Sequence, residues 1–191
     1  MGEISNTGFW ASATAHNHHV NSEPLGQWLA EYLKNYKEEC IYDFGCGLGY
    51  YLSVLKQSGF KYLTGFEGDP AVKRVFDNII KQDLTKPFKV PAKGTCIFLE
   101  VAEHIPAEFE AAALDNVINA CSGKLIMSWA VRGQAGFGHV NCLDNNEVID
   151  KMATRGFKCL DVDSASARSI NLDTAPWFRN TLFVFEKINN E

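Results

Sequence analysis

Short apolar runs alternate along this chain with segments whose apolar residues recur at helical spacing. The apolar runs predict strands at residues 41–44, 61–67, 79–80, 95–99, 124–129, 157–162 and 181–187. Helical spacing, with prolines near several starts and glycines after two ends, predicts helices at residues 24–36, 50–58, 70–78, 106–120 and 145–155. Strands that alternate with helices are typical of an α/β domain with a parallel sheet.

The end of the chain departs from this alternation. No helical pattern is seen between the last two predicted strands, at 157–162 and 181–187. Consecutive strands without a crossover helix pair antiparallel, so an antiparallel pair is expected at the end of the sheet. Residues 1–22 are polar and show no strand or helix pattern. We therefore predict an N-terminal lid segment over 1–22 and a single domain over 23–191.

Composition narrows the class of protein. The 191 residues are 46% hydrophobic and 21% charged, which is ordinary for a globular protein. The net charge of −5 argues against a nucleic-acid partner, because phosphate binding needs a concentrated basic face. Six cysteines occur without a C-x-x-C pair, and no apolar stretch reaches the ~18 residues of a membrane span. Reduced thiols and a cytoplasmic location are expected.

A glycine-rich turn and three acids predict a nucleoside-binding site. The turn runs from Asp43 to Gly49, between a predicted strand and a predicted helix, where backbone can approach a ligand closely. Glu67 ends the next strand and suits the hydroxyls of a ribose, while Asp83 follows the third strand and suits an adenine amino group. Tyr50 stands where a dinucleotide fingerprint has its third glycine, which argues against NAD.

Four segments resemble the signature motifs of class I S-adenosylmethionine-dependent methyltransferases. They are Asp43–Gly49, Gly65–Pro70, Gln82–Leu84 and Phe98–Pro106. The resemblance implies a Rossmann-like, seven-stranded, mostly parallel sheet with a reversed last strand and helices on both faces. It also implies S-adenosylmethionine as the cofactor, with S-adenosylhomocysteine as the product. The implied cofactor-binding residues are Asp43, Gly45, Cys46, Gly47, Gly49, Glu67, Gly68, Asp83, Leu84 and Glu100.

The second half of the chain is similar to a narrower group of methyltransferases. Gly133–Asn141 and Trp177–Asn180 resemble members found beside, or fused to, glycosyltransferases in glycan synthesis. Relatives carry a "GHVNEQP"-like stretch, and here Gly138–Asp144 keeps the histidine but lacks the Glu-Gln-Pro portion. The resemblance implies a carbohydrate acceptor, such as a deoxyhexose like rhamnose. It also raises the expectation that the chain belongs to a larger glycosyltransferase-containing polypeptide.

Histidines are the candidates for activating an acceptor hydroxyl. A neutral imidazole with a pKa near 6.5 can take the hydroxyl proton as the methyl group is transferred. His139 lies among glycines in the loop after the fifth strand and is the predicted general base, with His104 as a second or alternate base. No metal site is expected. The candidate acceptor-binding residues are Trp10, His18, Glu103 and Asn141.

Other functions stay open on the sequence alone. The same core could methylate a small metabolite or a quinone-like acceptor. An NAD-dependent oxidoreductase is disfavoured by Tyr50 and by the closing strand pair. A catalytically inactive cofactor-binding partner subunit is a further alternative, although Asp43, Glu67, Asp83 and His139 are all present. The leading interpretation is an O-methyltransferase that acts on a sugar hydroxyl.

Overall fold

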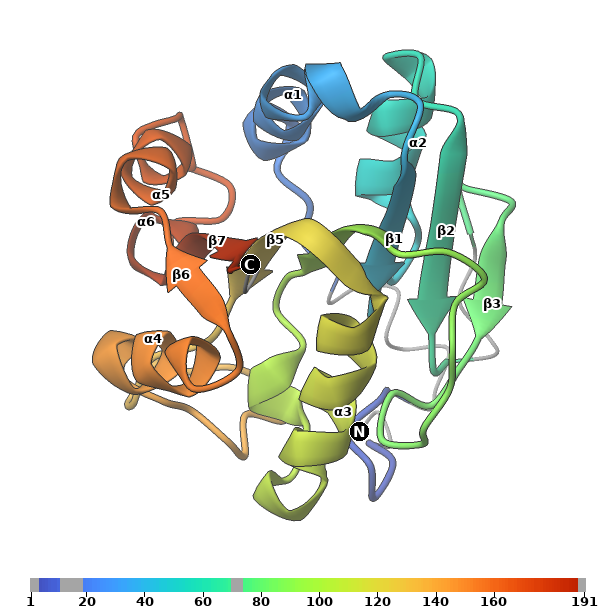
Figure 1. The fold of residues 1–191 in the computed structure, drawn as a ribbon. Coiled ribbons are helices and arrows are strands. Elements are labelled where there is room, and N and C mark those ends of the chain that lie inside the picture. Colours follow the sequence, from blue (N-terminus) through green and yellow to red (C-terminus); the bar gives the residue numbers. More distant parts are fainter. Residues whose placement is uncertain (1–3, 11–18, 70–73, 189–191) are drawn as a thin grey trace.

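A computed structural model describes residues 4–10, 19–69 and 74–188, and these residues contain a seven-stranded sheet (Figure 1). The strands are β1 (Cys40–Phe44), β2 (Tyr62–Glu67), β3 (Ile79–Lys81), β4 (Gly94–Phe98), β5 (Cys121–Ser128), β6 (Phe157–Cys159) and β7 (Leu182–Lys187). Their order across the sheet is β3-β2-β1-β4-β5-β7-β6. Only β7 runs antiparallel to its neighbours β5 and β6. The predicted mostly parallel sheet with a reversed last strand is confirmed.

Helices cover both faces of the sheet, as predicted (Figure 1). On one face lie α1 (Glu23–Tyr32), α2 (Tyr50–Gln57), α5 (Asp161–Arg168) and α6 (Phe178–Thr181). On the other face lie α3 (Ala107–Ala120) and α4 (Asn145–Ala153). Two short 3-10 helices, η2 (Lys34–Tyr36) and η3 (Ala102–His104), complete the described elements. No helix in the described ranges is long and apolar enough to cross a membrane.

The central strands show why the apolar runs are continuous. In β4, Cys96 and Phe98 pack with α3, while Ile97 packs with α1 and α2 on the opposite face. Every residue of β4 is buried. A parallel strand covered by helices on both sides needs apolar residues at successive positions rather than at alternate ones. The sequence pattern therefore follows directly from the two-sided burial.

Two predicted elements are wrong. The strand expected at 157–162 ends at Cys159, and α5 and α6 fill the stretch that we predicted to be without helices. The sequence shows no apolar helical pattern for α5, because its buried side chains are only the small residues Ser164 and Ala167. The expected helix at 70–78 is not helical over the described residues 74–78. There the Val75 N–H bonds to the carbonyl of Leu48, and this tertiary contact replaces a helical hydrogen bond.

Candidate functional site

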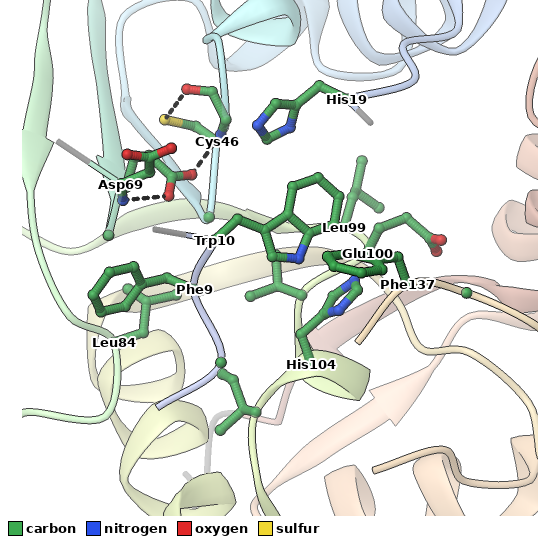
Figure 2. A pocket seen from close by; sticks show the side chains of 18 of the residues that line it. Phe9, Trp10, His19, Cys46, Asp69, Leu84, Leu99, Glu100, His104 and Phe137 are labelled. Carbon is green, nitrogen blue, oxygen red and sulfur yellow. Dashed lines mark hydrogen bonds between the residues drawn. The ribbon is translucent and has the colours of Figure 1, made fainter. Parts of the chain in front are cut away.

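A cavity of about 350 Å³ opens at the carboxyl ends of β1, β2 and β4, where ligands bind in open α/β sheets. Loops after β3 and β5 and the N-terminal segment complete its wall (Figure 2). Most of the predicted site residues line it, namely Trp10, Asp43, Gly45, Cys46, Gly47, Glu67, Gly68, Asp83, Leu84, Glu100, His104 and His139. Gly49, Glu103 and Asn141 lie outside its lining. His18 is outside the described residues.

The glycine turn is joined to the acid that follows β2. Gly47 has a left-handed φ of 52°, and its N–H donates to Glu67 Oε2 at 2.9 Å. A Cβ on Gly47 would lie 2.7 Å from His19 Nδ1, so only glycine leaves this part of the wall open. Gly49 serves the structure differently: it is the N-cap of α2, and a Cβ there would lie 2.6 Å from Phe76 Cβ.

Two buried acids give the cavity floor a strong preference for hydroxyl and cationic groups. Glu67 accepts from the N–H groups of Gly47 and Asp69, each at 2.9 Å. Asp43 is 3% exposed, and its Oδ2 has no hydrogen-bond partner among the described residues. Burial, reinforced by the nearby Glu67, raises the pKa of Asp43 to about 8. A ligand with donors here would satisfy an acceptor that the protein leaves without one.

Asp83 connects the cavity to the N-terminal segment. Its Oδ1 accepts from the N–H of Thr85 at 2.9 Å and from the Thr85 hydroxyl at 2.7 Å. Its Oδ2 accepts from the hydroxyl of Thr7 at 3.2 Å. Beside it the ring of Phe9 packs against Gly68, and Figure 2 shows this ring next to Leu84. Residues 7–9 thus lie directly on the motifs that resemble the adenine-binding part of a methyltransferase.

Glu100 has an unusual backbone at the end of β4. Its φ is 55°, the only left-handed φ of a non-glycine residue in the described ranges. The Ser128 hydroxyl accepts from the Glu100 N–H at 2.7 Å and donates to Glu100 Oε1 at 2.8 Å. Burial raises the pKa of Glu100 to about 7. Such strained positions concentrate at functional sites, where the surroundings hold them in place.

His104 and His139 meet at the mouth of the cavity, with ring centroids 5.0 Å apart. Nδ1 of His104 lies 3.3 Å from the carbonyl oxygen of Gly138, and Nδ1 of His139 lies 3.2 Å from that of Gln134. A carbonyl only accepts, so both Nδ1 atoms carry the proton and Nε2 holds the lone pair. Burial, with His139 as a second cause, lowers the pKa of His104 to about 4, which keeps it neutral.

Glu103 and Asn141 are placed behind this histidine pair. Asn141 is buried, its side chain donates to Glu110 Oε2 at 3.0 Å, and its carbonyl accepts from Trp129 Nε1 at 2.6 Å. The carbonyl of Glu103 accepts from the N–H groups of Val140 and Asn141 at 2.9 and 3.0 Å. These bonds attach the loop that carries His139 to η3. The backbone of Glu103 therefore helps to position the histidine loop, and the side chains of Glu103 and Asn141 lie outside the cavity lining.

Around Trp10, which was predicted from the sequence, the lining contains residues that the sequence did not single out. Trp10 lies between His19 and His104, at centroid distances of 5.1 and 5.5 Å, with Phe137 at 6.2 Å (Figure 2). Phe137 is 44% exposed and stands between two glycines, which is a signal for a side chain presented by a loop. Tyr51 and Leu99 also line the cavity, but their helix and strand positions made them look like ordinary core residues.

Several solved structures with the same fold are methyltransferases, and another is the [4+2]-cyclase SpnF. Magnesium protoporphyrin IX methyltransferase from Synechocystis PCC 6803, with bound SAH, matches with a TM-score of 0.61 and 16% identity, covering 86% of this chain and 82% of that chain. The sugar N-methyltransferase KedS8 from Streptoalloteichus sp. ATCC 53650 matches with a TM-score of 0.63 and 14% identity, and the match covers 87% of this chain and 88% of that chain. The methyltransferase domain of bacterial CtHen1-C matches with a TM-score of 0.62 and 17% identity, and the match covers 86% of this chain and 97% of that chain.

At these identities the likeness establishes the fold, a Rossmann-like methyltransferase fold that agrees with the predicted strand order. No protein-family model matches the sequence, and no curated protein matches it. The names of the first two proteins give a porphyrin and a sugar as acceptors, which differ in chemistry. The function of this chain therefore has to be argued from its own site.

Proposed function

We propose that this protein is an S-adenosylmethionine-dependent O-methyltransferase that acts on a sugar hydroxyl. The observation that carries the proposal is the placement of Asp43, Glu67 and Asp83, which lie at or just beyond the carboxyl ends of successive strands and line one cavity of a methyltransferase fold. One acid on a loop is common. Three acids at the carboxyl end of the same sheet, beside a glycine turn, form a nucleoside-binding arrangement.

The cavity residues fit this cofactor. S-adenosylmethionine would supply an electrophilic methyl group when bound. Glu67 has the two carboxylate oxygens that a ribose diol requires, and the Oδ2 of Asp43 is a buried acceptor for an ammonium group. Leu84, Gly68 and the ring of Phe9 give an apolar part of the lining on which a planar base would pack.

For the acceptor, the protein must align a hydroxyl and remove its proton. His139 is the proposed general base, because its Nδ1 faces the carbonyl of Gln134 and Nε2 is left with the lone pair. His104 is held in the same tautomer by the carbonyl of Gly138 and is neutral at physiological pH. His139 would receive the hydroxyl proton at Nε2 while the adjacent aromatic rings exclude water, and His104, with its low pKa, would be the weaker alternate base.

Aromatic side chains around the histidines favour a carbohydrate acceptor. Trp10 and Phe137 stand at the cavity mouth, and aromatic faces are suited to the C–H surfaces of sugars. A sugar N-methyltransferase is among the proteins that share the fold. The net charge of −5 disfavours RNA. A small non-sugar metabolite is the second candidate, and association with a glycosyltransferase stays a prediction.

Calorimetric titration tests the cofactor first, with S-adenosylmethionine and S-adenosylhomocysteine as ligands and NAD as the control. Micromolar binding of both adenosyl ligands without NAD binding is the expected result. A screen of nucleotide sugars and deoxyhexosides for a mass increase of one methyl group then tests the acceptor. Methylation of a non-sugar metabolite alone would replace the sugar assignment. Tight cofactor binding with no turnover on any acceptor would favour an inactive partner subunit.

A further inference from the structure

We infer that Glu103, His104 and His139 form a binding site for a divalent first-row transition-metal ion at the acceptor end of the cavity. One carboxylate oxygen and one ring nitrogen from each imidazole lie within 4.8 Å of one another. A cation among them would be close to all three atoms after small side-chain adjustments. The inferred site stands on this geometry, and only its catalytic role rests on the proposed function.

The strongest argument is the environment of Glu103. Its side chain is fully buried, and neither carboxylate oxygen has a hydrogen bond of good geometry within the ranges that the structure describes. None of the ion pairs in those ranges involves it, so no lysine or arginine compensates its charge. A buried carboxylate without a charged partner costs several kcal/mol. A bound cation would remove that cost.

The two imidazoles are prepared as ligands. Metal-binding histidines usually donate their second ring N–H to a carbonyl or carboxylate, which fixes the ring and its tautomer. His104 and His139 both do so, through Nδ1, to the carbonyls of Gly138 and Gln134. Gly136 leaves room for one of them, because a Cβ at this position would overlap Nε2 of His139. The lone pairs on Nε2 are therefore available to a cation.

The site is assembled from two distant segments. Glu103 and His104 end η3 after β4, whereas His139 lies in the loop after β5. The backbone bonds from Val140 and Asn141 to the Glu103 carbonyl bring the segments together. Sequence spacing alone gives no sign of this meeting, which is why no metal site was expected from the sequence.

Two imidazoles and a carboxylate suit first-row divalent metals such as Mn²⁺, Co²⁺ or Zn²⁺, and three protein ligands leave coordination positions open. On the proposed function, an open position would take the acceptor hydroxyl and lower its pKa. The O–H bond electrons stay on oxygen and the proton passes to water. That oxygen forms the bond to the methyl carbon as the carbon–sulfur bond breaks, with its electrons left on sulfur. The histidines then act as ligands rather than as a free base.

Metal binding is tested on the full chain after dialysis against a chelator. Titration with Co²⁺, followed by visible absorption and calorimetry, is expected to show about one equivalent bound with a spectrum typical of nitrogen ligands. Glu103→Gln keeps the shape of the side chain and is expected to weaken Co²⁺ binding by about 10- to 100-fold, as is His139→Gln. Cys142→Ser is the matched control, because its sulfur lies 3.8 Å from His139 Nδ1 and a thiolate could bind the metal instead.

Three results would overturn the inferred site. They are no Co²⁺ or Mn²⁺ binding by the folded wild-type chain, binding unchanged in Glu103→Gln, and binding lost in Cys142→Ser. Thermal unfolding of each variant shows whether weaker metal binding comes from a lost ligand or from a protein that no longer folds. The Co²⁺ spectrum of the wild-type chain tests the site without any variant. Metal binding without methyl transfer would defeat the proposed function and leave the site standing. Full methyl transfer in chelator would refute the metal's role and favour the free base.

Discussion

The hydroxyl of Ser128 contacts Glu100 at two points, accepting from its backbone N–H at 2.7 Å and donating to its Oε1 at 2.8 Å. Ser128 ends β5, and Glu100 follows the neighbouring strand β4. This single side chain therefore holds both the left-handed backbone and the carboxyl group of a residue in the cavity wall. The sheet register is what brings the two residues together.

Removal of this hydroxyl is expected to destabilise the protein and to slow the reaction. Ser128→Ala leaves a partly buried N–H without its partner, which typically costs about 1–3 kcal/mol in the free energy of unfolding. We expect turnover to fall by about 10-fold, because Glu100 loses its fixed position. Chemical denaturation and initial rates measure the two effects. Ser122→Ala, on the exposed end of the same strand, should change neither, and equal effects of both variants would contradict the prediction.

Glu67 is expected to control cofactor affinity. Glu67→Gln replaces one accepting oxygen by an amide group beside the donors of Gly47 and Asp69. The Kd for S-adenosylmethionine should rise by about 10- to 100-fold, as measured by calorimetry. Glu39→Gln, an exposed change just before β1, is the control and should bind normally. Unchanged affinity in Glu67→Gln would exclude it from the cofactor site.

The raised pKa of Asp43 predicts a stability that falls with pH. In the folded state the pKa is about 8 and in the unfolded chain it is near 3.8. Between these values the folded state binds the extra proton, so its stabilising effect is lost as the pH rises toward 8. Without ligand, the Tm should be higher at about pH 5.5 than at about pH 8. Asp43→Asn should weaken this dependence, with the part due to the raised pKa of Glu100 remaining, whereas Asp115→Asn, on the exposed face of α3, should preserve all of it.

Trp10 is expected to act on the acceptor more than on the cofactor. Its ring makes an edge contact with His104 at 5.5 Å and lies beside Phe137. Trp10→Ala should raise the KM for the acceptor by about 10-fold, with little change in the Kd for S-adenosylmethionine. Trp28→Ala removes a tryptophan that stacks on Tyr32 in α1, away from the cavity, and serves as the control. A large loss of cofactor affinity instead would place Trp10 in the cofactor site.

The fold could be predicted because burial leaves a strong trace in the sequence. Strands such as β4 are apolar at every position, and glycines mark the ends of the helices before Gly59 and Gly156. The helix α5 left no such trace, because Ser164 and Ala167 are small and weakly apolar. The helix predicted over residues 74–78 was wrong for another reason. There a hydrogen bond from Val75 to the distant glycine turn at Leu48 overrides the local helix preference.

The candidate site was only partly predictable. Asp43, Glu67 and Asp83 lie at or just beyond the carboxyl ends of their strands, so their meeting in space follows from a parallel sheet. The contact of Glu103 with His139 depends on how one long loop folds back after β5, which no periodicity encodes. The placement of residues 4–10 in the cavity wall could not be predicted either. It rests on a bridge between Ile4 and Trp10 and on the hydrogen bond from Thr7 to Asp83, and neither leaves a pattern in the sequence.

One short segment touches both halves of the cavity: the Thr7 hydroxyl bonds to Asp83, and the next residue, Gly8, packs against the carbonyl of His104 so closely that a Cβ would overlap it. On the proposed function, we expect a compulsory order, in which S-adenosylmethionine enters before the segment closes over it and the acceptor binds afterwards. S-adenosylhomocysteine is then expected to leave only when the segment moves away. The first turnover should then appear as a burst, and steady-state speed should follow the rate of release.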